Sequence, residues 1–210
     1  MASQDASRRS TRDNTARVAL IACGALAREA ARVAETTDWP VDVHPLPPLL
    51  HNRPERIAGE VEALAAQLIP RYRRVVVGYA DCGTRGAVDE VCERLRLSRL
   101  AGITCYDLYA GAEQFTRLTE DQPGTFFVTD YLAVAFHRSV IVELGLDRYP
   151  QLRDDYFGHY TRIVWLAQEP DDPQVAAAAQ EAARRIDLPL ETVPTGRSGL
   201  LAEMARLVAG

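Results

Sequence analysis

The chain has 210 residues, of which 47% are hydrophobic and 25% are charged, and its formal net charge is −5. This length and composition are typical of one globular domain with a sizeable core. The chain is acidic and its charged residues are interspersed, so it lacks the basic stripe that nucleic-acid backbones require. Nucleic acid is therefore excluded as an expected partner.

The amino-terminal segment 1–15 is polar and has no apolar period, which predicts a disordered leader. Residues 16–210 are predicted to form a single α/β domain. The leader has no apolar stretch typical of a secretion signal, and no apolar run in the chain is long enough to cross a bilayer. We therefore expect a cytoplasmic protein with no membrane partner.

Short apolar runs alternate with helical patterns from Arg17 onward. Runs typical of buried strands predict strands over 17–24, 41–47, 74–80, 100–111, 162–168 and 188–196. Apolar residues recurring every three or four positions predict helices over 25–37, 55–69, 87–97, 110–120, 173–187 and 198–210. Segment 125–146 is ambiguous between a strand entering a helix and one long helix. This alternation predicts a Rossmann-like α/β fold in three layers, a mostly parallel sheet with helices on both faces.

Two segments, 17–69 and 162–208, share the same order of strand, helix, strand, loop and helix. The similarity is consistent with a diverged duplication. It is equally a property of any α/β sheet, because such sheets repeat these units.

Three of the four cysteines, Cys23, Cys82 and Cys105, fall at or just past the carboxyl ends of predicted strands. Carboxyl ends of parallel strands meet at one edge, where ligands of open sheets bind. The fourth, Cys92, lies on the apolar face of a predicted helix and is expected to be a packing residue.

This placement has three interpretations. Three thiolates select zinc or another thiophilic metal and leave a fourth position open for a substrate or water. In the second interpretation the cysteines are small buried hydrophobic residues of the core. In the third they are thiols that carry out redox or nucleophilic chemistry. His51 follows the second predicted strand and is the one histidine at the same edge, as a metal ligand, a general base or a structural hydrogen-bonding residue.

The stretch "RRVVVGYADCGTRGAVDE" runs from a buried strand through Cys82 into a glycine-flanked helix start. Backbone N–H groups and Arg85 are predicted to hold a carboxylate or phosphate there, as is Arg197 in "PTGRSGLLAE". Alternatively, both turns only cap the helices that follow them, and this role requires no ligand. Neither turn has a dinucleotide or P-loop pattern. The predicted ligand-binding residues of this stretch are Tyr79, Asp81, Gly83, Thr84 and Arg85.

Aromatic residues gather in "TCYDLYAG" and "PGTFFVTDYL". Aromatic faces attract methylated ammonium groups by cation–π interaction, although aromatic residues near strand ends also serve as core. From these segments we predict that Tyr106, Tyr109 and Thr125 contribute to ligand binding.

The motifs "ACGALARE", "LHNRPERI", "GYADCGTRG", "CYDLYAG", "PGTFFVTDYL" and "LDRYPQLRDDYFGHY" together cover most of the chain after Arg17. The set resembles a bacterial and archaeal family known as domain of unknown function sixteen thirty-eight. Cysteines that recur in that family correspond to Cys23, Cys82 and Cys105. Family members often have a histidine just before the last of these cysteines. In this chain Thr104 occupies that position, so a metal-ligand role for it does not carry over.

Genes of this family often lie near corrinoid-dependent methyltransferase systems for methylated amines. The resemblance therefore implies a small-molecule substrate such as a methylated amine, and a corrinoid protein or methyltransferase as partner. We expect a zinc-thiolate protein whose zinc activates a thiol or water as the nucleophile in methyl transfer. The alternatives are a non-catalytic accessory protein that handles metal or corrinoid, and a thiol redox protein.

Overall fold

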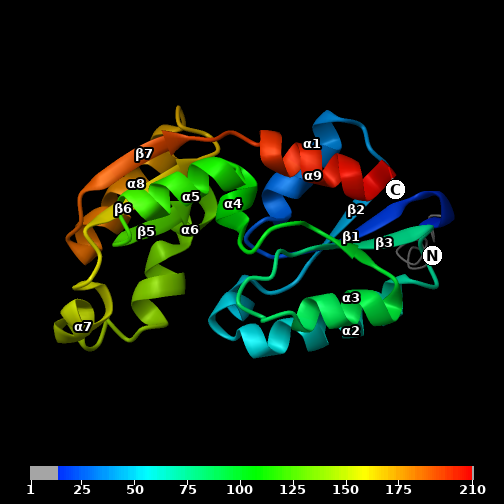
Figure 1. Cartoon of the computed structure of the whole chain (residues 1–210), viewed down its shortest axis with the longest axis horizontal. Coiled ribbons are helices and arrows are strands. Elements are labelled where there is room, and N and C mark those ends of the chain that lie inside the picture. The colour runs from blue at the N-terminus through cyan, green and yellow to red at the C-terminus, as the bar shows by residue number, and fades with distance from the viewer. Residues whose placement is uncertain (1–13, 210) are drawn as a thin grey trace, which may run out of the picture.

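The computed structural model describes residues 14–209 (Figure 1). Residues 1–13 of the predicted leader lie outside this range, and Asn14–Ala16 form the short 3-10 helix η1. Within the described range, no helix combines the length and apolar character needed to span a bilayer.

The first sheet contains the central strand of the amino-terminal half, β1 (Val18–Ala22), all of whose residues are buried. Its other strands are β2 (Val41–Pro45), β3 (Arg74–Gly78) and the two-residue β4 (Ser98–Arg99). The order is β2-β1-β3-β4, and every pair is parallel. The carboxyl ends of β1, β2 and β3 consequently lie side by side.

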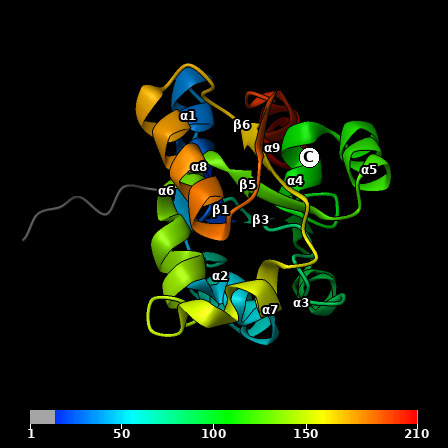
Figure 2. The ribbon, with the colours of Figure 1, turned by 90° about the vertical axis from the view of Figure 1, so that its left-hand side faces the viewer.

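Helices cover both faces of this sheet. α1 (Ala27–Thr36) and α9 (Ser198–Ala209) lie on one side, and α2 (Ile57–Leu68) and α3 (Ala87–Leu95) lie on the other (Figures 1 and 2). Two 3-10 turns, η2 (Pro48–Asn52) and η3 (Pro54–Arg56), connect β2 to α2. We call this sheet with its four helices the first lobe.

The second sheet consists of β5 (Thr125–Thr129), β6 (Arg162–Ala167) and β7 (Leu190–Pro194), which are parallel and adjacent in that order. One face packs on α6 (Asp130–Phe136) and α8 (Pro173–Ile186), and the other on α4 (Cys105–Ala110) and α5 (Ala112–Asp121). The remaining elements are the π-helix η4 (His137–Val142), the 3-10 turn η5 (Pro150–Leu152) and α7 (Arg153–Phe157). We call this sheet, with α5 to α8 and the turns between them, the second lobe.

The predicted α/β class, with parallel strands and helices on both faces, is confirmed. The described strands divide into two sheets instead of joining one. The ambiguous segment 125–146 is a strand that enters a helix.

The strand predicted over 100–111 is wrong, because α4 begins at Cys105. Thr104 and Asp107 form a capping box. The Thr104 side chain accepts hydrogen bonds from the backbone of Tyr106 and Asp107, while the Asp107 carboxylate accepts from the Thr104 N–H at 2.8 Å. Three otherwise unpaired N–H groups are satisfied in this way, which favours a helix start over a continued strand.

Helix α9 follows β7 along the chain but leaves the second sheet. Its buried residues Leu200, Met204 and Leu207 pack in the same core as β1. Residues 162–208 therefore do not form a unit equivalent to residues 17–69, whose second helix stays on its own sheet. The crossing of α9 joins the two lobes, as does α4, which contributes Leu108 to one core and Tyr106 to the other.

Candidate functional site

The carboxyl ends of the two sheets face each other. Glu29 at the start of α1, beyond β1, is bound by Arg197, which follows β7. On the same helix, Arg32 is bound by Glu169, which follows β6. Loops at the carboxyl edges of both sheets thus meet at the junction of the lobes, where ligands of α/β proteins bind.

Three cysteines come to this junction from three separate segments. Cys23 directly follows β1, is 1% exposed, and donates its backbone N–H to Gly78 at 3.0 Å. Cys82 follows β3 with a left-handed φ of 48°, and its N–H donates to Ile103 at 2.8 Å. Because of this bond, the segment before α4 lies against the end of β3. Cys105, which begins α4, is thereby placed at the same edge of the sheet as Cys82. The expectation that Cys105 ends a strand is thus corrected: it is the first residue of a helix.

The three thiols belong to one core: Cys23 is buried in it, and Cys82 and Cys105 pack against it. Burial raises the pKa of Cys23 to about 12, and the charge of Cys82 adds to this effect. Burial also raises the pKa of Cys105 well above its usual value, with the charges of Cys23 and Cys82 contributing. The pKa of Cys82 rises to about 11, again through burial first. We call these three residues the thiol cluster, and their thiols stay protonated near pH 7 unless a cation compensates their charge.

His51 on η2 lies against this cluster. The Sγ atom of Cys23 is 3.7 Å from His51 Nδ1 and 3.6 Å from Nε2, and Nδ1 is 3.3 Å from the Pro48 carbonyl. Burial lowers the pKa of His51, which keeps the imidazole neutral at pH 7. Neutral imidazole is the form that binds metals. His44, by contrast, bonds to Tyr72 at 3.0 Å within the first lobe.

The hydroxyl of Tyr79 is the one unusual polar group near the thiols. Tyr79 is fully buried, and its oxygen has no well-formed hydrogen bond within residues 14–209. Burial raises the pKa of this phenol, the charges of Cys23 and Cys82 raise it further, and a weak contact with the Cys23 thiol adds to the effect. The ring stacks on His51 with 6.2 Å between centroids. A buried donor left unpaired is costly, so its placement beside two thiols needs a chemical reason.

The loop after β3 is organised by one carboxylate. Asp81 accepts hydrogen bonds from the Thr84 hydroxyl at 2.9 Å and from the backbone N–H groups of Gly83, Arg85 and Gly86 at 3.2, 3.3 and 2.8 Å. The N–H groups that were expected to hold an external anion therefore already serve Asp81. Hydrogen bonding, first from Gly86, lowers the pKa of Asp81. The Arg85 side chain is exposed, and its anion binding stays a prediction.

The predicted aromatic and threonine ligand residues separate in the structure. Tyr109 is 4% exposed and lies at the junction, where burial and then the Cys105 charge raise its pKa. Tyr106 packs on Phe127 in the second lobe, with 5.7 Å between ring centroids. Thr125 begins β5 at the opposite end of the strand, where its hydroxyl accepts from Arg162 at 2.8 Å. Thr125 is thus not brought to the cysteine cluster.

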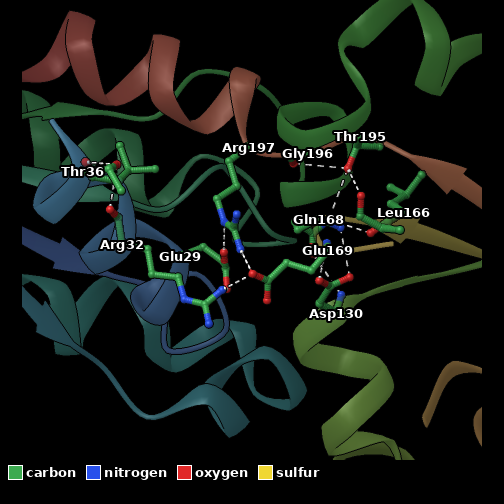
Figure 3. Close-up of polar contacts among 12 residues, drawn as sticks. Glu29, Arg32, Thr36, Asp130, Leu166, Gln168, Glu169, Thr195, Gly196 and Arg197 are labelled. Atoms are coloured by element: carbon green, nitrogen blue, oxygen red, sulfur yellow. Dashed lines mark hydrogen bonds and ion pairs between the residues drawn. The ribbon is translucent and has the colours of Figure 1, made fainter. Parts of the chain in front are cut away.

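A network of charged residues closes one side of the junction (Figure 3). Glu169 binds Arg32 at 2.6 Å and Arg197 at 2.8 Å, and Arg197 also binds Glu29. These contacts, first with Arg32 and then with Arg197, lower the pKa of Glu169 to about 2. Arg197, which was expected to hold an external anion, thus binds carboxylates of its own chain. The sequence carries no local signal for pairs so far apart.

Asp130, the first residue of α6, fixes the wall of the second lobe. Its carboxylate accepts hydrogen bonds from Trp165 Nε1 at 2.7 Å and from the backbone N–H groups of Gln168 and Glu169 at 3.0 and 2.8 Å. In return, Gln168 accepts from the Asp130 N–H at 2.9 Å (Figure 3). Sequence reasoning missed this residue. The bonds place Glu169 where Arg32 and Arg197 reach it.

We expect Glu169→Gln to lower the free energy of unfolding by about 1–2 kcal/mol at pH 7, because the substitution removes a carboxylate shared by two arginines. A carboxyl with a depressed folded-state pKa stabilises the fold above its unfolded pKa. The difference from wild type should therefore shrink as the pH falls from about 4.5 towards 2. Urea unfolding of both proteins at several pH values measures this difference in the free energy of unfolding.

Glu181→Gln is the matched control. Glu181 also binds two arginines, Arg184 and Arg185, but all three lie on α8. Its replacement should change stability much less than Glu169→Gln does, since exposed pairs within one helix contribute little. Equal effects of the two substitutions would show that the network does not hold the lobes together.

Comparison with known proteins supports one assignment. No curated protein and no solved structure matches the sequence significantly. The sequence model of a family described as protein of unknown function, DUF1638, matches residues 45–204, which include Cys82, Cys105 and His51. This match covers most of the chain and confirms the resemblance seen in the sequence motifs. The chain belongs to the DUF1638 family.

Proposed function

We propose that Cys23, Cys82, Cys105 and His51 bind a zinc ion at the junction of the two lobes. The observation that carries the proposal is that three cysteines from three distant segments belong to one core, where Cys23 contacts the neutral imidazole of His51. Sulfur and imidazole nitrogen are the donors that zinc prefers.

The spacing of two of these donors suits a tetrahedral ion. Bond lengths of about 2.3 Å to sulfur and about 2.0 Å to nitrogen place the two donor atoms about 3.5 Å apart. Cys23 Sγ and His51 Nε2 are 3.6 Å apart. Within residues 14–209, however, no group of three or more His, Cys, Asp or Glu side chains is already arranged to hold a metal ion. The proposal therefore requires the Cys82 and Cys105 side chains to turn towards this pair.

The poorly satisfied Tyr79 hydroxyl, whose nearest acceptor is the Cys23 thiol, is a second argument for negative charge at this place. A phenol O–H beside neutral thiols has only weak acceptors, whereas a thiolate is a strong one. Deprotonation of Cys23 on metal binding would give this buried donor its partner. Hydrogen-bond donors of this kind commonly bond to the side chains that ligate a metal and so fix their orientation.

Bound zinc supplies a Lewis acid that stabilises thiolates and lowers the pKa of a thiol or water in the fourth position. In this chain the fourth position belongs to His51, which is held by a 3-10 turn and one backbone contact. Release of His51 would open that position to a substrate thiol. Tyr109 and the cross-lobe network would meanwhile keep bulk water from the cluster.

Metal analysis tests the proposal directly. The purified full chain, dialysed under reducing conditions, should contain ~1 zinc per chain by mass spectrometry, and zinc should raise the melting temperature of chelator-treated protein. Absence of bound metal together with an unchanged melting temperature would refute zinc binding. If mild oxidation of that metal-free protein then linked two of the three cysteines, the thiol redox alternative would replace it.

Methyl transfer is a further proposal that depends on the zinc site. A zinc-bound thiol is the nucleophile that accepting a methyl group requires, and the gene context of the family suggests methylated amines or a corrinoid protein as the donor. An enzyme should transfer methyl groups from such a donor to a thiol in multiple turnovers. A metal- or corrinoid-handling accessory protein should bind its partner without turnover.

A further inference from the structure

A cavity of about 470 Å³ lies between the lobes next to the segment that carries His51. The first lobe contributes Arg53 and its neighbour Asn52, and the second lobe contributes part of the π-helix η4 and four aromatic residues. This volume is within the range of small-molecule sites, which often form between structural units.

One wall of the cavity is aromatic. Phe126 meets Phe157 and Tyr160 edge-on, with ring centroids 5.5 and 5.3 Å apart. Tyr156, which also lines the cavity, leaves 40% of its surface exposed. Phe157 is only 4% exposed, so the ring surface open to a ligand comes from Phe126, Tyr156 and Tyr160, on which a flat apolar group can pack. The wall thus favours a ligand with a ring.

Two charged residues of opposite sign also line the cavity. Arg53 and Glu143 are both exposed, and neither has an ion-pair partner anywhere in residues 14–209. Neighbouring arginines differ, since Arg56 binds Glu60 at 3.1 Å and Arg153 binds Asp154 at 2.8 Å. Arg53 alone would favour an anion, and Glu143 alone a cation. Together they favour a ligand that carries both charges.

The backbone around the cavity is unusual. The Asn52 side chain donates a hydrogen bond to the Ser139 carbonyl in η4 at 3.3 Å, which joins the lobes at the cavity. π-Helical turns are rare and occur frequently at functional sites. Because His51 precedes Asn52 and contacts Cys23, a ligand in the cavity would lie beside the thiol cluster.

We propose that this cavity binds a small zwitterion with a flat ring, such as an aromatic amino acid. Arg53 binds its carboxylate, Glu143 binds its ammonium group, and the wall formed by Phe126, Tyr156, Phe157 and Tyr160 holds the ring. This site is distinct from the proposed zinc site, and its occupancy does not depend on metal.

The test uses three probes that differ only in charge: L-tryptophan, tryptamine, which lacks the carboxylate, and indole-3-propionate, which lacks the ammonium group. Calorimetry with the full chain, both zinc-loaded and treated with chelator, should show L-tryptophan binding about tenfold more tightly than either analogue. Binding by the chelator-treated protein separates this inference from the proposed zinc site.

Substitutions assign the two charges. Arg53→Ala should weaken L-tryptophan and indole-3-propionate about tenfold without affecting tryptamine, and Glu143→Gln should weaken L-tryptophan and tryptamine instead. Arg148→Ala, an exposed arginine outside the cavity, is the control and should change nothing. Melting curves of each variant check the fold. If no probe bound at about 1 mM, or if neither cavity substitution changed the preference among probes, the inference would be wrong.

Discussion

Replacing Asp130 by alanine is expected to lower the free energy of unfolding by about 2–4 kcal/mol. The carboxylate is the acceptor for Trp165 Nε1 and for two backbone N–H groups, and Trp165 and Gln168 are only 2% and 4% exposed. Alanine leaves these donors buried without a partner. Burial raises the pKa of Asp130, because desolvating the charged carboxylate costs free energy. Alanine avoids this cost, which offsets part of the stability lost with the hydrogen bonds.

Asp171→Ala is the control for this experiment. Asp171 is exposed, lies in the turn that follows β6, and makes no side-chain hydrogen bond or ion pair within residues 14–209. The denaturation midpoints of the two variants should differ clearly, because the total free energy of unfolding of such a domain is only about 5–15 kcal/mol. Similar midpoints for Asp130→Ala and Asp171→Ala would mean that water replaces the lost carboxylate.

Serine in place of Cys23, Cys82 or Cys105 is expected to reduce bound zinc from ~1 per chain to nearly none in each variant. Serine is close to cysteine in size, but its oxygen stays protonated at pH 7 and is a poor ligand for zinc. Loss of one thiolate leaves two soft donors and an imidazole, which are too few for tight binding. Zinc content after dialysis measures the effect.

Cys92 provides the matched control within the same chain. It is 5% exposed on α3, and burial raises its pKa to about 11, much as for the clustered thiols. After burial, the charged groups that affect its pKa are Arg99 and Asp89, and no other cysteine is among them. Cys92→Ser should therefore keep its zinc and lose only some stability. Equal zinc content in all four variants would reject the proposed site.

The sequence by itself determined the local elements with a continuous apolar run or a clear helical period. β1, β3 and β6 are buried on both faces except for the arginines that begin β3 and β6, and that environment requires a run of apolar residues. Cys23 and Cys82 were located at the sheet edge for the same reason, since a run that ends in polar residues or glycine marks the strand end.

One local error concerns α4, and the missing signal was present in the sequence. Thr104 and Asp107 have the spacing of a capping box, but the aromatic residues between Cys105 and Tyr109 favour a strand by composition. Hydrogen bonding at the helix start decided the conformation. Cys105 nevertheless reaches the cluster, because the preceding segment hydrogen-bonds to Cys82.

Only the tertiary structure decided which strands pair, where α9 packs and which charged residues meet. Strand pairing depends on how whole faces fit together. The central strands β1 and β6 are both continuous apolar runs, so local patterns do not show that they belong to different sheets. Arg197 and Glu29 are 168 positions apart, and their contact exists because α9 leaves the second sheet to cover the first. The cavity between Arg53 and Glu143 has the same origin, since no local pattern relates side chains from separate lobes.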